Sequence, residues 1–151
     1  MATRAAGVST EKKYMSVRSF FDTNILLYTD DEAFPAKQQQ ALALVAQHKR
    51  DRSGVVSMQV LQEYFVIATR KFHVDAGMAR RKVEMFATFD VAAPEVADIV
   101  AAIDLHRLHG FSFWDALIVR TAKQSGCRVV LSEDMQGGRE VEGLRIVNPF
   151  Q

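Results

Sequence analysis

The sequence predicts a single α/β domain with three layers, in which helices cover both faces of a central parallel sheet of about five strands. Short β-like runs alternate with longer runs whose apolar residues recur at helical spacing, and no internal repeat or low-complexity linker interrupts them. Such alternation is typical of parallel sheets with helical crossovers. The length of 151 residues suits one hydrophobic core.

The predicted strands are short. In chain order they are SVRSFF, ending near Phe21, then GVVS, DVAA, CRVVLSED and LRIVNP, which Pro149 closes. In sheets of this kind, ligands bind beyond the carboxyl ends of the strands, where the strand order reverses. Polar residues that directly follow a strand are therefore candidates for a binding site.

The predicted helices carry start and stop signals. Proline suits the first position of the helix from Pro35, and Ser57 is expected to cap the helix MQVLQEYFVIATRK. Gly110 and Gly126 are expected to end two later helices, as glycine often does. The other helical segments are a short one after the first strand, and residues 75–89, 94–110 and 111–126.

The composition excludes several classes of protein. A formal net charge of +1 gives no global attraction to nucleic acid or membrane, so any nucleic-acid contact must use local patches. The one cysteine, Cys127, excludes an internal disulfide and fits a reducing cytosol. No apolar stretch approaches the ~20 residues of a membrane helix. We expect a cytoplasmic protein, with a flexible tail over residues 1–14, one domain over residues 15–151, and Met15 as an alternative start.

The first strand is followed by two polar side chains that could take part in a reaction. Asp22 comes directly after the strand, and Asn24 lies two residues further on. Both residue types are common helix caps, because their oxygens accept bonds from the free N–H groups of a helix start. A reaction site is the alternative, and this segment alone does not decide between them.

Two further carboxylates occur near the starts of helices. Glu63 lies on the same side of its predicted helix as Val60 and Ile67, so it borders the apolar stripe, although a surface glutamate is a common alternative. Asp115 is embedded in FSFWDALIV, where burying an unpaired carboxylate costs several kcal/mol. Its alternative is a capping box with Ser112, which usually employs the longer Glu or Gln.

A fourth carboxylate follows the fourth predicted strand. Asp134 lies in VVLSEDMQGG beside Glu133, and Ser132 is expected to donate a hydrogen bond that orients Asp134. Polar loops after strands are common, so this segment is weak evidence by itself. Several carboxylates at one edge of a sheet, however, raise one another's pKa unless a cation lies among them. Oxygen ligands suit Mg²⁺ or Mn²⁺, and the four histidines are scattered without a zinc pattern.

Four segments follow one another in the order FFDTNILLY, VVSMQVLQEYF, FSFWDALIVRTA and VVLSEDMQGG. They resemble the motifs of PIN-domain nucleases, and specifically of the VapC-type toxins of bacterial toxin–antitoxin pairs. The resemblance extends over nearly all of the domain. It implies a catalytic and metal-binding cluster with two supporting side chains, and it gives Glu133 no role. The cluster is Asp22, Glu63, Asp115 and Asp134, and the supporting residues are Asn24 and Ser132.

The resemblance also implies the sheet order 3-2-1-4-5, which places Asp22 and Asp134 on either side of the crevice. The implied activity is that of an endoribonuclease, in which Mg²⁺ or Mn²⁺ assists the hydrolysis of RNA phosphodiester bonds and so blocks translation or growth. The implied partners are an RNA substrate, a cognate small antitoxin protein and a second copy of the chain in a homodimer. We expect no association with a membrane.

Basic side chains near the cluster are expected to bind RNA phosphates. Arg120 has the strongest case, because it lies five residues after Asp115 on the same predicted helix. A solvated helix face is the common alternative for each of the others, which are Lys49, Arg50, Arg52, Arg70, Lys71, Arg80, Arg81 and Lys82.

Two alternatives remain open at this point. One is a housekeeping PIN-type enzyme that processes RNA or acts on DNA. The other is a receiver-like regulatory module that binds Mg²⁺, but the paired acids, central aspartate and late lysine of that class are absent, and it does not explain Asp115. A haloacid-dehalogenase phosphatase would need an aspartate where this chain has Asn24.

Overall fold

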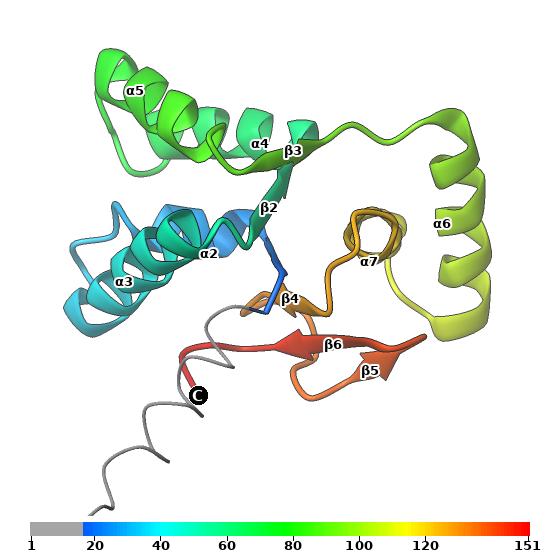
Figure 1. Ribbon diagram of the computed structural model, residues 1–151. Helices are drawn as coiled ribbons and strands as arrows, with labels where there is room; N and C mark the ends of the chain where they lie inside the picture. Colours follow the sequence, from blue (N-terminus) through cyan, green and yellow to red (C-terminus); the bar gives the residue numbers. More distant parts are fainter. Residues whose placement is uncertain (1–16) are drawn as a thin grey trace, which may run out of the picture.

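The computed structural model describes residues 17–151, so the predicted tail over residues 1–14 and the alternative start at Met15 lie outside the described residues. Six strands form one sheet in the order β3-β2-β1-β4-β6-β5 (Figure 1). Neighbouring strands are parallel, except that β5 is antiparallel to β6. The strands are β1 (Ser19–Phe21), β2 (Gly54–Ser57), β3 (Asp90–Ala92), β4 (Val129–Leu131), β5 (Glu140–Val141) and β6 (Leu144–Val147).

The predicted fold class is confirmed, and the five predicted strands occur in the predicted order, with β6 as the fifth. The additional strand, β5, forms a tight hairpin with β6. Its turn residues Glu142 and Gly143 have φ angles of 50° and 84°, which suit the two-residue turns that connect antiparallel strands. A strand of two residues is too short to show an alternating pattern, so the sequence did not reveal it.

The helices begin largely where the sequence predicted. Pro35 is the first residue of its helix, and the Ser57 hydroxyl accepts the N–H of Val60 at 3.2 Å. One helix begins at Val96 instead of Pro94, because the chain is still extended at its N-cap. The helices are α2 (Thr23–Tyr28), α3 (Pro35–Asp51), α4 (Met58–Arg70), α5 (Ala76–Phe86), α6 (Val96–His109) and α7 (Phe113–Gln124). Within residues 17–151, no helix is both long enough and apolar enough to cross a membrane.

The core surrounds the central strand β1. Phe20 and Phe21 of β1 are fully buried, as are Val55 of β2 and Val130 of β4 on either side of them. Figure 1 shows α2 and α3 on one side of these strands, and α7 with α6 outside it on the other. Asp22 directly follows β1, so it lies at the end of a central strand with β2 and β4 on either side.

Candidate active site

Asp22 lies at the carboxyl end of β1 and is only 7% exposed. Its backbone N–H donates to the carbonyl of Leu131 at 3.0 Å, which extends the pairing of β1 with β4. Its Oδ1 accepts the N–H of Thr23 at 2.7 Å, so Asp22 is the N-cap of α2. Its Oδ2 accepts bonds from Ser132 Oγ at 2.7 Å and Asn24 Nδ2 at 3.2 Å. Asp22 thus caps a helix and also presents a fixed carboxylate at the edge of the sheet.

Asn24 and Ser132 join α2 to the loop after β4. The Asn24 amide donates to Asp22, while its Oδ1 accepts the backbone N–H of Glu133 at 3.1 Å. The predicted hydrogen-bond partner of Ser132 was wrong, because the hydroxyl donates to Asp22 and not to Asp134. The adjacency of β1 and β4 brings Ser132 next to Asp22. Both residues therefore orient Asp22.

Asp115 lies in the first turn of α7. The Ser112 hydroxyl caps this helix by accepting the N–H of Asp115 at 3.1 Å. In the described part of the chain, no bond from the Asp115 carboxylate back to the N–H of Ser112 completes a capping box. Burial raises the pKa of Asp115, the hydroxyl of Ser112 opposes this rise, and the nearby charge of Asp134 adds to it.

Three of the predicted carboxylates influence one another electrostatically. Burial raises the pKa of Asp22 to about 6, against the lowering effect of the hydrogen bonds from Ser132 and Thr23. The negative charges of Asp115 and Asp134 raise it further. The exposed Asp134 follows β4 and the half-buried Asp115 starts α7, so the fold brings them near Asp22 from distant points in the sequence.

Glu63 is joined to the cluster through Thr23. The Thr23 hydroxyl donates to Glu63 Oε2 at 2.7 Å, while the backbone N–H of the same residue donates to Asp22. Gln59 donates to Glu63 Oε1 at 2.8 Å. Neither donor was predicted from the sequence. Thr23 lies between two residues that were predicted, and Gln59 lies four residues before Glu63 on the same helix face, so spacing could have identified Gln59.

The four carboxylates have no ion-pair partner among residues 17–151. Their neighbour Glu133 differs, because it forms a salt bridge with Lys37. Arg120, the favoured RNA contact, donates to Asp98 of α6 at 3.0 Å, so its charge serves the packing of α6 on α7. Its contact with RNA remains a prediction.

The acidic cluster meets one requirement of a metal site, the ligand type, but not the close convergence of its side chains. Among residues 17–151, no group of three or more His, Cys, Asp or Glu side chains converges tightly enough to hold an ion. The chemistry of the set nevertheless fits a hard divalent cation, since all the acids present carboxylate oxygens. A cation beside Asp22 would also offset the repulsion from Asp115 and Asp134 that raises the pKa of Asp22.

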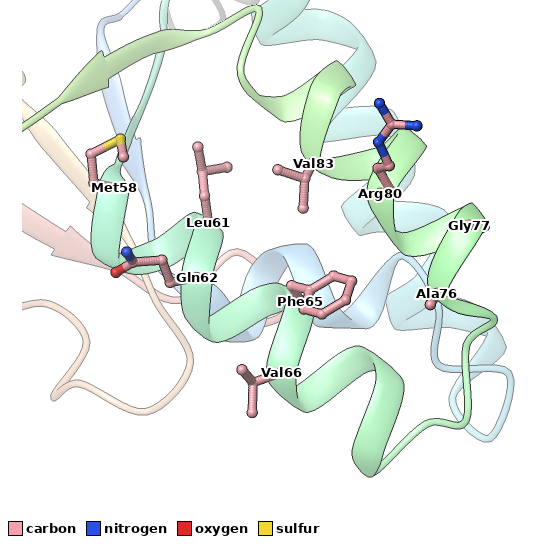
Figure 2. Close-up of a pocket in the computed structure, with 9 residues that line it drawn as sticks. All are labelled: Met58, Leu61, Gln62, Phe65, Val66, Ala76, Gly77, Arg80 and Val83. Atoms are coloured by element: carbon pink, nitrogen blue, oxygen red, sulfur yellow. The ribbon is translucent and has the colours of Figure 1, made fainter.

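A large apolar groove lies on the other side of α4, between this helix and α5 (Figure 2). It has a volume of about 730 Å³. Helix α4 turns Gln59 and Glu63 toward the acidic cluster, and Met58 and Phe65 toward the groove. The groove is lined by Met58, Leu61, Gln62, Phe65, Val66, Ala76, Gly77, Arg80 and Val83.

The sequence matches the PIN domain family over residues 19–137, a range that includes all four carboxylates. Among solved structures, the chain is similar to VapC20 of Mycobacterium tuberculosis, a toxin that cleaves the Sarcin-Ricin loop. The identity is 20% and the TM-score 0.62, over 77% of this chain and 91% of that one. It is also similar to a toxin–antitoxin complex from Klebsiella pneumoniae, with 20% identity and a TM-score of 0.62 over 87% and 97% of the two chains. No curated protein sequence matches it.

Proposed function

The chain belongs to the PIN domain family, and on that basis we propose that it is a metal-dependent endoribonuclease and the toxin of a toxin–antitoxin pair. The observation that carries the proposal is a set of carboxylates at the carboxyl edge of the sheet that lack cationic partners among residues 17–151. Asp22 is the buried member of this set, and its pKa is raised toward neutrality. We assign the activity to one nuclease domain over residues 15–151, working in the cytoplasm.

The ion we propose is Mg²⁺ or Mn²⁺, held by Asp22 and Asp115 with help from Glu63 and Asp134. Such an ion lowers the pKa of a bound water and offsets negative charge on the scissile phosphate. The carboxylates are the groups in the cluster that can accept a proton from the attacking water. Glu63 is suited to this task because Gln59 and Thr23 fix its orientation from both oxygens.

The protein prepares the site by fixing carboxylates before any ligand arrives. Three donors hold Asp22 in one orientation, and a carboxylate fixed in this way loses little freedom when it binds an ion. Asp134 is exposed on its loop, so it is the member of the cluster most open to substrate. We therefore propose that the phosphodiester bond is hydrolysed at the protein surface beside Asp134.

The test is cleavage of single-stranded RNA by the purified protein. We expect cleavage in Mg²⁺ or Mn²⁺, loss of cleavage in excess chelator, and recovery when metal is restored. Cleavage that persists in excess chelator would exclude the metal-dependent mechanism. A preparation of the Asp115→Asn variant, purified in parallel, controls for contaminating ribonucleases.

The proposed partners are a small antitoxin protein and a second copy of the chain. The similarity to a toxin–antitoxin complex supports an antitoxin as a partner. The α4–α5 groove in Figure 2 is the apolar surface to which we propose that it binds. Met58, Phe65 and Val66 are 48%, 38% and 44% exposed and line the same groove, and contiguous exposed apolar side chains commonly mark partner sites. Light scattering tests the homodimer, and a monomer at all concentrations would contradict it.

The antitoxin is expected to be encoded beside this gene. Co-expression of the small neighbouring gene should yield a complex that no longer cleaves RNA, and Phe65→Ser should weaken that complex. A housekeeping enzyme is the alternative, and it predicts no such neighbour and no inhibition.

A further inference from the structure

A second hollow opens directly beside the acidic cluster, with a volume of about 350 Å³. Asn24 and Asp134 of the cluster form part of its wall. The wall also includes the side chains of Tyr28, Phe34, Lys71 and Phe72, and we call this hollow the aromatic cleft. We propose that the aromatic cleft binds one base of a single-stranded RNA next to the scissile phosphate, while Lys71 binds a neighbouring phosphate. The proposal rests on the nuclease function proposed above.

The size and lining of the aromatic cleft suit a base with its sugar. Ligand pockets range over roughly 300–1,000 Å³, so the cleft is at the small end of that range. Its wall combines aromatic rings with amide, carboxylate and ammonium groups, whereas the α4–α5 groove is almost entirely apolar. An aromatic face accepts any base by stacking, and the polar groups can bind its edge or its sugar.

Phe34 provides an exposed ring at one side of the cleft. It is 52% exposed and stands edge-on to Tyr28, with ring centroids 6.2 Å apart at 87°. Phe34 is also the N-cap of α3, where Ser, Thr, Asp or Asn would normally accept a backbone N–H, and its side chain makes no such bond. The helix thus lacks the usual side-chain cap at its start. The Lys37 ammonium lies 5.5 Å from the centre of the Phe34 ring, and the exposed part of the ring is open to a ligand.

Lys71 supplies a cation that is not neutralised by a carboxylate in the described part of the chain. It is exposed at the end of α4, and its ammonium lies 5.5 Å from the centre of the Phe72 ring. The other cations near the cluster are paired: Lys37 with Glu133, and Arg120 with Asp98. Lys71 is therefore the basic side chain of the cleft that can bind a phosphate without losing an existing ion pair.

Another hollow adjoins the cleft and shares two of its lining residues. Lys71 and Phe72 also border a further hollow of about 530 Å³, which extends past His73. A strand that places one base between Phe34 and Phe72 can thus leave the acidic cluster along the loop after α4. Direct contact with the cluster through Asn24 and Asp134 sets the bound base beside the phosphate that is cut.

The experiment measures binding of a short fluorescein-labelled single-stranded RNA by anisotropy in Mg²⁺. All proteins carry Asp115→Asn, so that the RNA stays intact. Phe34→Leu and Phe72→Leu keep apolar volume but remove the flat ring, and each should raise the Kd by roughly 5- to 100-fold. Phe65→Leu is the matched control, because it removes an exposed ring from the α4–α5 groove, and it should leave the Kd unchanged.

A second arm removes the base instead of the ring. Replacing one nucleotide at a time by an abasic nucleotide should reveal one position at which binding weakens, and at that position Phe72→Leu should cause no further loss. Lys71→Gln should lower the salt dependence of binding by about one phosphate contact. Lys49→Gln should not, because Lys49 borders a hollow at the amino ends of β2 and β3, at the opposite edge of the sheet.

Equal Kd values for the parent and both leucine variants would overturn the proposal that the aromatic cleft binds a base. Losses from the abasic nucleotide and from Phe72→Leu that add to each other would overturn it as well. Failure of the nuclease function looks different, since unsubstituted protein would then leave RNA uncut in Mg²⁺ and Mn²⁺ whatever the binding data show. Thermal melts of each variant establish that binding losses do not arise from unfolding.

Discussion

Helices α6 and α7 start in the same way but use their first-turn aspartates differently. Each has an aspartate three residues after its N-cap, Asp98 after Glu95 and Asp115 after Ser112. Asp98 accepts the N–H of Glu95 at 2.8 Å and the guanidinium of Arg120 at 3.0 Å, and these two bonds hold its pKa below the usual range. Burial raises the pKa of Asp115, which has no ion-pair partner in the described residues. One aspartate stabilises the fold, and the other keeps a carboxylate available for a ligand.

The adjacent residues Glu133 and Asp134 show the same contrast within one loop. Burial alone would raise the pKa of Glu133, but the bonds from Lys37 and Tyr28 lower it below its usual value. Asp134 is exposed and has no ion-pair partner in the described part of the chain. The presence of a cationic partner therefore distinguishes structural acids from candidate catalytic acids here better than proximity in the sequence does.

The largest effect is expected from exchanging Asp115. Asp115→Asn should lower kcat/KM for RNA cleavage by roughly 100-fold or more, because it removes a proposed metal ligand, and such a ligand is worth several kcal/mol of transition-state stabilisation. The midpoint of thermal unfolding should stay equal or rise, since one source of repulsion is gone. Asp98→Asn should do the opposite and lower the thermal midpoint with cleavage retained. Retained cleavage in Asp115→Asn with a lower thermal midpoint would assign Asp115 to capping.

A pH series on the metal-free protein should separate the two kinds of acid. The folded-state pKa of Asp22 is about 6 and its unfolded value is near 3.8, so the folded protein binds more protons between these values. Its contribution to the free energy of unfolding should thus increase as the pH falls from about 7 to 4, by on the order of 2–3 kcal/mol at most. The lowered pKa of Asp98 acts with opposite sign, and its stabilisation is lost only as the pH falls through that pKa.

Urea denaturation at each pH, with chelator or with Mg²⁺, provides the measurement. Mg²⁺ should remove the gain on acidification, because the ion binds the ionised carboxylate. Asp22→Asn should remove the same gain without metal. A pH dependence that is identical in the Asp22→Asn variant would show that Asp22 is not the group responsible.

An intermediate effect is expected from Asp134 and almost none from its neighbour. Asp134→Asn should reduce cleavage or metal affinity by roughly 10- to 100-fold. Glu133→Gln changes the same loop by the same chemistry but removes a charge that is already bonded to Lys37 and Tyr28, so cleavage should change by less than about threefold. Kinetics at saturating and limiting Mg²⁺ compare the two variants. Equal losses would mean that the loop geometry and not the free carboxylate matters.

The smallest effect on stability should come from two serines with different partners. Ser132→Ala and Ser112→Ala each remove one hydroxyl that satisfies a backbone N–H, and each should cost about 1 kcal/mol of unfolding free energy. Only Ser132→Ala also removes a donor to Asp22, so only this variant should raise the pKa of Asp22 further. Carboxyl ¹³C chemical shifts followed through pH report that pKa. A pKa unchanged by Ser132→Ala would contradict the assigned hydrogen bond.

The sequence predicted those features that depend on local signals. Pro35 and Ser57 marked helix starts, and four carboxylates near strand ends or helix starts indicated one site. Apart from Gln59 and the two-residue strand β5, the features it missed depend on contacts between distant segments. Lys37 and Glu133 are 96 positions apart, and Arg120 and Asp98 are 22 apart, so no spacing rule could pair them. The sequence paired Ser132 with Asp134, two residues away. Only the pairing of β1 with β4 brings the Ser132 hydroxyl next to Asp22.

The central place of β1 has a consequence for the order of events during synthesis. The strand pairs with β2 and β4, so Asp22 gains its partner Ser132 only after most of the chain has been made. Asp134 follows Asp22 by 112 positions, from 22 to 134. At about 5–20 residues per second, the ribosome needs roughly 6–22 s to cover that distance. During this interval the nascent chain already contains the first of the four proposed catalytic acids but lacks the fourth, so under that proposal it could not cut RNA until its own translation is nearly finished.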